Sequence, residues 1–350
     1  MQASSELHII VPGICGPLAE IQSLKNHKGV EQWVQSLSKA KASPSINSAN
    51  DALSEIFSLD IEGDFPSAAF ELLGNDLYDH EKHYMHADPV HLQADMDHAI
   101  LTSSEDLNVT ALETTGLCDA LNSHFSQDDI AFLSPADNRW FVETKNKIQM
   151  TTTPLSEAIG RNVNFILPEG HDAMRWKQML TEAQMLMFSH DVNQSREIRA
   201  LRLINSLWFH GVGDLPVVGS QVCNVNSLCG NQGVLKGLAR HVRCNYLMMP
   251  DSVDEYIENL PDSATGSVNV IHLAELQHLV NYTDVSIWTE NLLELLESWV
   301  YPLIRMAHKN NINVILYPCN KKQYHFSKHD YLRFWCRGKL EQHVHSYQQV

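Results

Sequence analysis

Short apolar runs that alternate with amphipathic segments constrain the fold of this 350-residue chain most strongly. Residues 7–11, 268–273 and 312–317 are almost continuously apolar, which is typical of strands buried on both faces of a parallel sheet. Helical periodicity separates such runs, most clearly at residues 287–308, where Pro302 predicts a bend. The alternation predicts an α/β fold with a doubly wound, mainly parallel sheet and helices on both of its faces.

A different pattern occupies the chain between about residues 85 and 150. Residues 89–101 alternate apolar and polar side chains, which predicts a half-exposed strand, and residues 108–125 predict an amphipathic helix. Two short strands are expected next, at 130–133 and 140–142, joined by turn-forming residues. This segment therefore predicts a compact α+β unit. The other expected elements are helices at 17–24, 30–37, 52–57, 67–73, 171–189, 233–242 and 253–260, strands at 204–209 and 246–249, and a loop at 40–50.

The first residues and the cysteines bear on the cellular setting. The opening sequence MQASSELHIIVPGICGPL has neither a basic leader nor a long apolar run, so we expect no signal peptide, no membrane contact and a cytoplasmic protein. The seven cysteines are an odd number without CxxC spacing, and we expect them to be free thiols in a reducing compartment.

The net charge of −17 lies in one segment of the chain. Residues 51–130 contain 18 Asp or Glu and one basic residue, Lys82, whereas the rest of the chain has 24 acidic and 24 basic residues. An acidic surface repels nucleic acid, so nucleic acid is an unexpected partner. The part after Tyr301 has eight Lys or Arg against two acidic residues, and it can bind the acidic segment of the same or another subunit.

Residues 186–213 combine polar side chains of the kinds that bind anions with an apolar run and a Gly-x-Gly turn. Arginine offers a planar fork of donors and asparagine offers both a donor and an acceptor, so together they can hold a phosphate or carboxylate. The simpler interpretation is that His190 and Asn193 cap a helix whose arginines form a solvated face. The candidate residues are His190, Asn193, Arg196, Asn205, Trp208, Gly211 and Gly213, with Arg199 and Arg202 beside them.

Metal ligands are expected where parallel strands end, because the chemistry of such folds lies in the loops there. Of the three apolar runs, only the one ending at Leu273 is followed by plausible ligands, Glu275 and His278, and two ligands do not make a metal centre. Two histidine clusters occur elsewhere: His80, His83 and His86, with Asp79, Asp88 and His91 nearby, and His325 and His329 with Cys336. Neither matches a tight zinc signature, and an exposed histidine-rich loop is the simpler explanation for each.

Sequence motifs for a catalytic nucleophile are absent. The chain has no Gly-x-Ser-x-Gly elbow and no glycine-rich phosphate loop with Lys and Ser or Thr. Ser67 lies where a loop enters a predicted helix, which suits either a helix cap or an anion bound by backbone N–H groups.

The 186–213 stretch also carries a family resemblance. HDVNQSREIRALRLINSLWFHGVG resembles a segment of the archaeal-type cofactor-independent phosphoglycerate mutases that reads His-Pro-x-Asn-x-x-Arg, then Pro-Ala-Asn-x-x-Trp and Gly-x-Gly. Weaker matches follow in the same order along the chain. PSAAFELLGND (66–76) is similar to the helix with that family's nucleophilic serine, and ADPVHLQAD (87–95) is similar to the start of its inserted domain. NRWFV (138–142) is similar to a substrate-facing strand, and TTTP (151–154) is similar to an Asp-Thr-Asp-Pro-His motif. The blocks ADPVHL, RW, LPxG and HxVNxxR before NSLW are closer still to a group of uncharacterised bacterial proteins, and the chain is identified as a member of that group.

The resemblance implies an architecture and a binding site. It implies an alkaline-phosphatase-like α/β core of residues 1–80 and 186–350, with an α+β domain inserted at 81–185. It also implies a site for a small phosphorylated or carboxylated ligand. The residues implied for that site are Asp88, His91, Arg139, His190, Asn193, Arg196, Asn205, Trp208, Gly211 and Gly213.

The chain departs from the resembled family at the residues that carry its chemistry. That chemistry uses a serine and two divalent ions, which stabilise charge on the attacking and leaving oxygens. The first strand is not followed by the expected Asp, and Phe65 or Pro66 stands where the serine is expected. Leu276 and Gln277 interrupt an Asp-Glu-x-x-His motif, and residues 318–320 (Pro-Cys-Asn) replace an Asp-His pair. We therefore expect no metal cofactor and a degenerate, non-catalytic relative that binds a small anionic ligand or a protein partner in a regulatory role.

Two alternatives remain open at this point. The first is an active phosphomutase or phosphohydrolase with rearranged ligands for Mn or Zn. Its candidate ligands are His272, Glu275, His278, His325 and His329. The second is a structural interaction module that assembles through the acidic segment and the basic carboxyl-terminal part.

Overall fold

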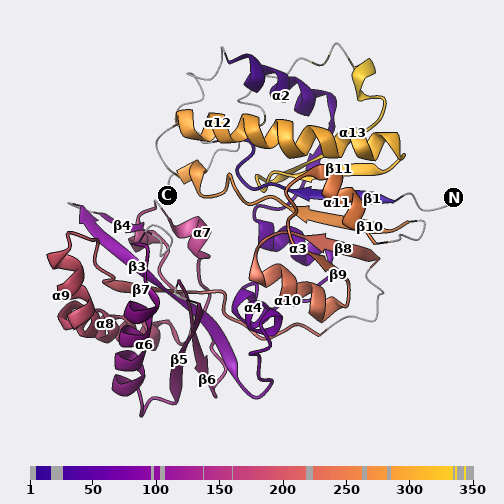
Figure 1. Ribbon diagram of the computed structural model, residues 1–350. Coiled ribbons are helices and arrows are strands. Elements are labelled where there is room, and N and C mark those ends of the chain that lie inside the picture. The colour runs from indigo at the N-terminus through magenta and orange to yellow at the C-terminus, as the bar shows by residue number, and fades with distance from the viewer. Residues whose placement is uncertain are drawn as a thin grey trace. The chain divides into compact units, whose positions relative to one another are not determined.

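The chain folds into two compact units (Figure 1). One unit comprises Met1–Asp60 and Val218–Val350, and the other comprises Ile61–Val217. The computed structural model describes residues 5–16, 27–95, 98–102, 107–136, 138–159, 161–217, 224–261, 266–281, 285–333, 336 and 343. Each unit has its own sheet and its own apolar core.

The first unit is built on a seven-stranded sheet with the order β2-β12-β11-β1-β10-β8-β9. Its strands are β1 (Glu6–Ile10), β2 (Lys41–Pro44), β8 (Val225–Cys229), β9 (Asn245–Leu247), β10 (Val268–His272), β11 (Asn313–Tyr317) and β12 (Lys322–Phe326). β1 is parallel to both β10 and β11, β8 is parallel to β10 and β9, and only β12 runs antiparallel to its neighbours β11 and β2. The predicted mainly parallel sheet is confirmed.

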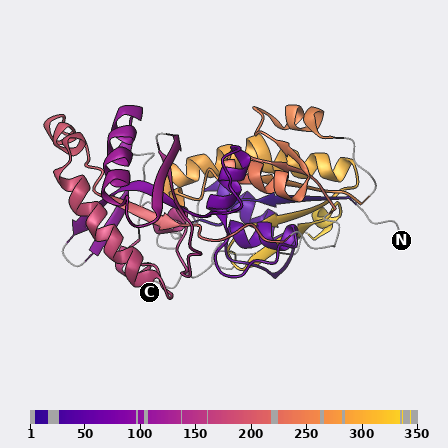
Figure 2. The ribbon, with the colours of Figure 1, turned by 90° about the horizontal axis from the view of Figure 1, so that it is seen from below.

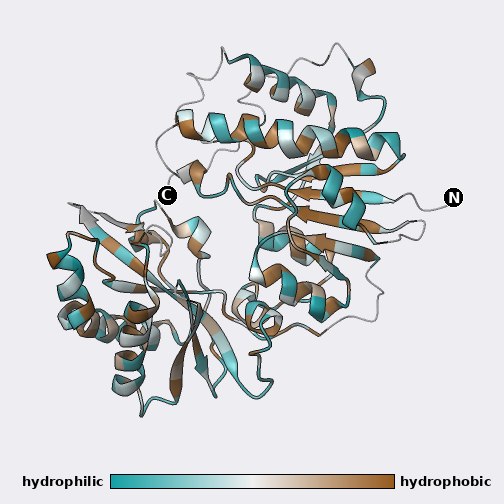
Figure 3. Ribbon diagram, in the orientation of Figure 1, coloured by the Kyte–Doolittle hydropathy of each residue, from teal (hydrophilic) through white to brown (hydrophobic). Residues whose placement is uncertain are grey.

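Burial on both faces explains why the central strands are largely apolar. Four of the five residues of β1, β10 and β11 are buried in each case, and Figure 3 shows these strands in brown among helices of mixed colour. The surrounding helices are α2 (Lys28–Lys39), α3 (Ala49–Ile56), α10 (Gly233–Val242), α11 (Val253–Asn259), α12 (Val285–Leu295) and α13 (Tyr301–Lys309), with short 3-10 turns at Leu279–Asn281 and Asp330–Leu332. The apolar stripe of α2, which includes Trp33, packs with Trp288 of α12 in the core above β1.

The helix predicted at 287–308 is present and contains a π-helical segment. α12 and α13 are joined by a π-helical segment, Leu296–Val300, which directly precedes α13 and its Pro302. A proline lacks the N–H that would continue the hydrogen-bond ladder, and a wider turn accommodates this loss. None of the helices within the described residues has both the length and the apolar character needed to cross a lipid bilayer.

The second unit contains an antiparallel sheet in the order β4-β3-β6-β5, with β7 also paired to β3. Its strands are β3 (His83–Asp95), β4 (His98–Thr102), β5 (Ile130–Ala136), β6 (Arg139–Thr144) and β7 (Ser206–His210). Its helices are α4 (Ser67–Gly74), α6 (Ala111–His124), α7 (Leu155–Ala158), α8 (Ala173–Ser189) and α9 (Asp191–Ile198), with a 3-10 turn at Val163–Phe165. α6, α8 and α9 pack against one another, α6 against β5 and α8 against β7 (Figure 2).

The structure differs from the sequence prediction at several boundaries. The single strand predicted at 89–101 is two paired strands, β3 and β4, and the predicted loop at 40–50 contains the edge strand β2. The helix predicted at 17–24 lies outside the described residues. The second unit extends beyond the expected 81–185, because α4 packs on β3 and β7 pairs with β3.

Candidate functional site

A buried cluster of charged and imidazole side chains lies within the second unit, where β3, β6, β7 and α4 meet. β3 contributes His86 and Asp88, which lie on the same face of the strand because they are two residues apart. β7 contributes His210, which is paired in register with His86. β6 contributes Arg139 and α4 contributes Glu71. The cluster therefore unites residues from four elements that are distant in sequence.

Asp88 is the centre of the polar contacts in this cluster. Its side chain is fully buried, with His210 Nε2 2.9 Å and Arg139 Nη1 3.5 Å from its Oδ2 atom. The backbone N–H of Trp140 donates to its Oδ1 atom over 3.3 Å. Burial alone would raise the pKa of Asp88, but the hydrogen bond to His210 and the charge of Arg139 lower it to about 2. Asp88 is therefore a carboxylate at neutral pH.

The two histidines are stacked and incompletely hydrogen-bonded. The ring centroids of His86 and His210 are 4.4 Å apart with planes inclined by 13°. Burial, and next the neighbouring His210, lower the pKa of His86 well below its ordinary value, so His86 is a neutral imidazole. Within the described residues the Nδ1 atoms of both rings are buried without a hydrogen-bond partner. Such atoms are uncommon in folded proteins and often mark a place for a ligand, ion or water.

Glu71 and Arg139 complete the cluster on the side of α4. Glu71 Oε2 lies 3.9 Å from His86 Nε2, and its Oε1 lies 4.0 Å from Arg139 Nε. Burial raises the pKa of Glu71, although the charge of Arg139 opposes this effect. The Arg139 side chain is about one-third exposed, at 36%, whereas that of Glu71 is 11% exposed. Solvent therefore reaches the cluster at Arg139.

Gly211 allows the chain to pass close to the cluster directly after β7. Its φ angle is +64°, and an added Cβ would overlap Ser67 Oγ and lie 3.0 Å from His86 Cδ2. Its N–H donates to Thr152 Oγ1 over 3.2 Å, and the Thr152 N–H and hydroxyl both donate to Asp64. The absence of a side chain at Gly211 thus brings Ser67, the first residue of α4, against β7.

Replacing Gly211 by alanine is expected to lower the free energy of unfolding by about 2–4 kcal/mol, from a strained backbone and the overlap with Ser67. Gly63→Ala is the matched control, since Gly63 also has a positive φ, +89°, but nothing lies within 4 Å of an added Cβ. That control should lose only about 1–2 kcal/mol. Urea unfolding of both variants measures the difference, and equal losses would show that the close approach at Gly211 is unimportant.

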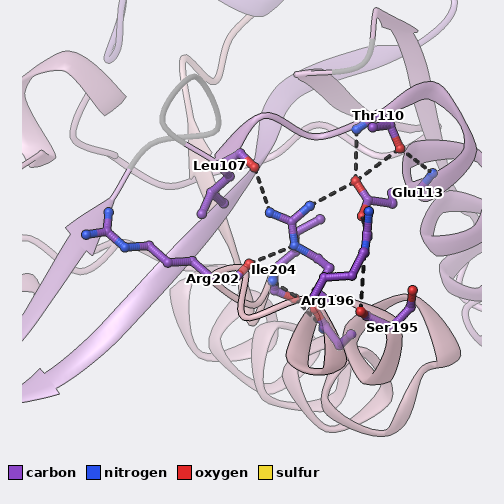
Figure 4. Close-up of polar contacts among 9 residues, drawn as sticks. Leu107, Thr110, Glu113, Ser195, Arg196, Arg202 and Ile204 are labelled. Carbon is purple, nitrogen blue, oxygen red and sulfur yellow. Dashed lines mark hydrogen bonds and ion pairs between the residues drawn. The ribbon is translucent and has the colours of Figure 1, made fainter.

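Arg196 of the 186–213 stretch is buried and hydrogen-bonded within the protein rather than open to solvent (Figure 4). The Arg196 side chain is 1% exposed. Its Nε donates to the Arg202 carbonyl over 2.7 Å, its Nη1 to Glu113 over 2.8 Å and its Nη2 to the Leu107 carbonyl over 2.6 Å. Arg199 also contacts Glu113, over 2.7 Å. These contacts occupy all three nitrogens of the Arg196 guanidinium, so the structure does not support its prediction as an anion-binding residue.

The asparagines of the same stretch bind backbone groups in a similar way. Asn193 donates to the carbonyls of Met187 and Ile204 and accepts from the Ile204 N–H. Asn205 exchanges two hydrogen bonds with the backbone of Leu92. The other residues of the set are also engaged within the protein. His190 Nδ1 accepts from the Val192 N–H and caps α9, His91 contacts the Leu203 carbonyl, the Trp208 ring N–H donates to the Thr153 carbonyl, and Gly213 lies against Pro66. His190 thus has the capping role of the simpler interpretation, whereas Arg196 is buried rather than solvated.

Of the ten residues implied by the resemblance, the structure brings Asp88, Arg139 and Gly211 to the cluster. It adds His86, His210 and Glu71, which the sequence analysis did not select for this site. The histidine cluster His80, His83 and His86 does not share one face, because β3 is a strand and places His83 and His86 on opposite faces. His83 contacts Asp214 instead, over 2.5 Å. The spacing that could have predicted this part of the cluster is His86-x-Asp88, because residues two apart on a strand lie on the same face.

The strand ends of the seven-stranded sheet are the place where the resemblance implies two divalent ions. β1, β10 and β11 end level, since Ile10 pairs with both His272 and Tyr317. His272 is buried, and neither of its ring nitrogens has a hydrogen-bond partner within the described residues. Burial raises the pKa of the Cys15 thiol, which follows β1, to about 12, so without an ion it is protonated and uncharged. Within the described residues the one group of three potential ligands lies in the second unit. The residues at these strand ends therefore do not fit a two-ion centre.

The rearranged ligand set of the alternative hypothesis does not converge either. His325 lies on β12 and contacts Ser43 and Gln323. β12 is three strands away from β10, which carries His272, so their backbones are about 14 Å apart. His329 is exposed. These separations exceed what side chains around one metal ion can span.

Comparisons with known proteins agree with this fold. No family model matches the chain. A stretch of 122 residues, 34% of this chain, is 23% identical to the 2,3-bisphosphoglycerate-independent phosphoglycerate mutase of Methanosarcina mazei and spans 31% of that protein, about a third of its length. Among solved structures, PH0037 protein from Pyrococcus horikoshii has a TM-score of 0.50 at 12% identity, covering 93% of this chain and 87% of that one. The cofactor-independent phosphoglycerate mutase from Thermoplasma acidophilum has a TM-score of 0.39 at 15% identity, covering 92% and 90%. The chain thus has weak sequence similarity to a cofactor-independent phosphoglycerate mutase and shares its overall α/β fold with the Pyrococcus protein.

Proposed function

We propose that this chain is a degenerate phosphoglycerate-mutase-like protein that binds a small phosphorylated or carboxylated ligand without turning it over, in a regulatory role. One observation carries the proposal. Asp88, Arg139 and Gly211 were implied as ligand-binding residues, and they lie together around two buried histidines whose Nδ1 atoms lack partners within the described residues. In small-molecule sites a few converging polar groups of this kind fix the orientation of the ligand.

Arg139 gives this site its preference for an anion. Its planar guanidinium suits the paired oxygens of a phosphate or carboxylate. Its ion pairs with Asp88 and Glu71 are long, at 3.5 and 4.0 Å, and its side chain is partly exposed. An anion arriving from solvent can therefore form shorter contacts with Arg139 than these two carboxylates do. The similarity to a phosphoglycerate mutase makes phosphoglycerates the first ligands to test.

The non-catalytic part of the proposal rests on the first unit. Phosphoryl transfer in the resembled family depends on divalent ions, which stabilise the charge that develops in the transition state by several kcal/mol. Within the described residues, the strand ends that would hold them bring together no group of three potential metal ligands. Binding without turnover is the function that agrees with both units.

The test is a thermal-shift screen of the full chain with 3-phosphoglycerate, 2-phosphoglycerate, phosphoenolpyruvate and inorganic phosphate. At one hundred times its Kd, a ligand should stabilise the protein by about 2.7 kcal/mol, which raises Tm by a few degrees. Arg139→Ala should remove the shift, whereas Arg175→Ala, at an exposed arginine that contacts the Asp128 carbonyl and Trp176, should keep it. A shift that persists in Arg139→Ala, or no shift with any of the four compounds, contradicts the proposal.

A further inference from the structure

We propose that His86, Asp88 and His210 bind a divalent first-row transition-metal ion, with Glu71 beside them as a further ligand. The inference deepens the proposed function, on which it rests, because the ion would be the cation that receives the anionic ligand. It concerns residues of the second unit alone.

The donor atoms already lie close together. One ring nitrogen from each histidine and one oxygen of Asp88 all lie within 4.8 Å of one another. His210 Nε2 and Asp88 Oδ2 are 2.9 Å apart, close to the separation of two ligands on one small ion. Glu71 Oε2 is 3.9 Å from His86 Nε2, near enough to join after a small rotation. Only small side-chain movements therefore separate this arrangement from a metal site.

The donor side chains are buried, and paired strands carry three of them. His86 and His210 are direct partners in the β3–β7 ladder, and their rings stack. His86, Asp88 and His210 are only 2%, 0% and 6% exposed. Ligands fixed on paired strands need little ordering when an ion binds. The Nδ1 atoms that lack partners within the described residues leave each imidazole one nitrogen for its proton and another for the ion.

The charges of the cluster favour a cation at its centre. Asp88 and Glu71 place two carboxyl groups beside the histidines, and Arg139 is the cation that contacts both of them. An anionic ligand entering this cluster by itself would meet those carboxylates at close range. A divalent ion between them offsets their charge, so that with Arg139 the cluster carries a net positive charge. The ion and Arg139 can then bind the same phosphate or carboxylate.

The chemistry of the donors indicates the class of ion. Two imidazoles and a carboxylate suit Zn²⁺, Co²⁺ or Fe²⁺, whereas Mg²⁺ and Ca²⁺ prefer sets made only of oxygen. A set of two histidines and one carboxylate also leaves coordination positions open for an incoming ligand. We therefore expect tight binding of Co²⁺ and Zn²⁺ and no comparable binding of Mg²⁺.

The test is a titration of the metal-stripped full chain with Co²⁺, without phosphate or any organic anion in the buffer. The expected result is a visible absorption band that saturates at one ion per chain, is displaced by Zn²⁺ and is unaffected by Mg²⁺. His210→Ala and Asp88→Asn should each weaken Co²⁺ binding about tenfold or more. His83→Ala is the matched control, because His83 lies on β3 but on its opposite face, and it should bind as the wild type does. Circular dichroism checks that each variant is folded. If Asp88→Asn does not fold, His86→Ala takes its place in the titration.

The outcomes separate this inference from the function on which it rests. Absence of a band, or a band that persists in folded His210→Ala and His86→Ala, overturns the metal site whatever the ligand screen shows. A band without stabilisation by any of the four anions keeps the metal site and overturns the proposed ligand. The combined proposal further expects Zn²⁺ to increase the thermal shift caused by the anion in the wild type but not in His210→Ala.

Discussion

Replacing Arg196 by alanine is expected to lower the free energy of unfolding by about 3–5 kcal/mol. The Arg196 side chain is 1% exposed and is the donor to Glu113 and to two backbone carbonyls, those of Leu107 and Arg202. The variant leaves these buried acceptors without that donor and creates a cavity, and each of these changes is costly. The measurement is urea unfolding followed by tryptophan fluorescence, since Trp176 lies in the core of the same unit.

Arg199→Ala is the matched control for this prediction. Arg199 contacts the same Glu113 carboxylate, but its side chain is 49% exposed, so its loss should cost less than about 1 kcal/mol. Similar losses in the two variants would contradict the structural role of Arg196. A stable Arg196→Ala variant that has lost its anion-dependent thermal shift would instead restore Arg196 as a ligand-binding residue.

The second large effect is expected at His272, through the dependence of stability on pH. Burial lowers the pKa of His272 in the folded protein to about 4, whereas an unfolded histidine titrates near pH 6.5. Above pH 6.5 the residue is neutral in both states and contributes no pH dependence. Between pH 6.5 and 4 the unfolded chain takes up a proton that the folded chain does not, so stability falls as the pH is lowered, by about 3 kcal/mol in total.

His272→Leu should remove this part of the pH dependence. The substitution has little to break, because neither ring nitrogen of His272 has a hydrogen-bond partner within the described residues. Between pH 7.5 and 4.5 the variant should therefore lose about 2–3 kcal/mol less stability than the wild type. His171→Leu, at a side chain that is 82% exposed, should follow the wild type. Urea midpoints at both pH values provide the comparison, and parallel losses in all three proteins would contradict the buried neutral state of His272.

The fold of the first unit was predictable from its sequence because strands that are buried on both faces appear as short apolar runs. β1, β10 and β11 are short apolar runs, and such runs between helices specify a parallel sheet. The edge strand β2, Lys41–Pro44, has no such pattern, since none of its residues is buried and its sequence, KASP, is that of a loop. The extent of the second unit was equally hidden, because the pairing of β7 with β3 joins segments that are more than one hundred residues apart.

The candidate site was only partly predictable, for a related reason. Asp88 and Arg139 were accessible through the resemblance, and Gly211 through its place after an apolar strand. His210 and Glu71 carry no local signal, since they reach the cluster through strand pairing and helix packing. Arg196 illustrates the opposite error. The donors that suit a phosphate also suit backbone carbonyls and a buried carboxylate, and a sequence does not show which acceptor lies nearby.

The most direct test of binding without turnover is an enolase-coupled assay of the full chain with 3-phosphoglycerate and added Mn²⁺ or Zn²⁺. The assay reports 2-phosphoglycerate as it forms, so it detects the mutase reaction whichever residues carry it. We predict no rate above that of a control without the protein, because within the described residues the strand ends of the first unit bring together no group of three ligands for the ions that this chemistry uses. A metal-dependent rate that Ser67→Ala abolishes in a folded variant would contradict the account and identify an active enzyme.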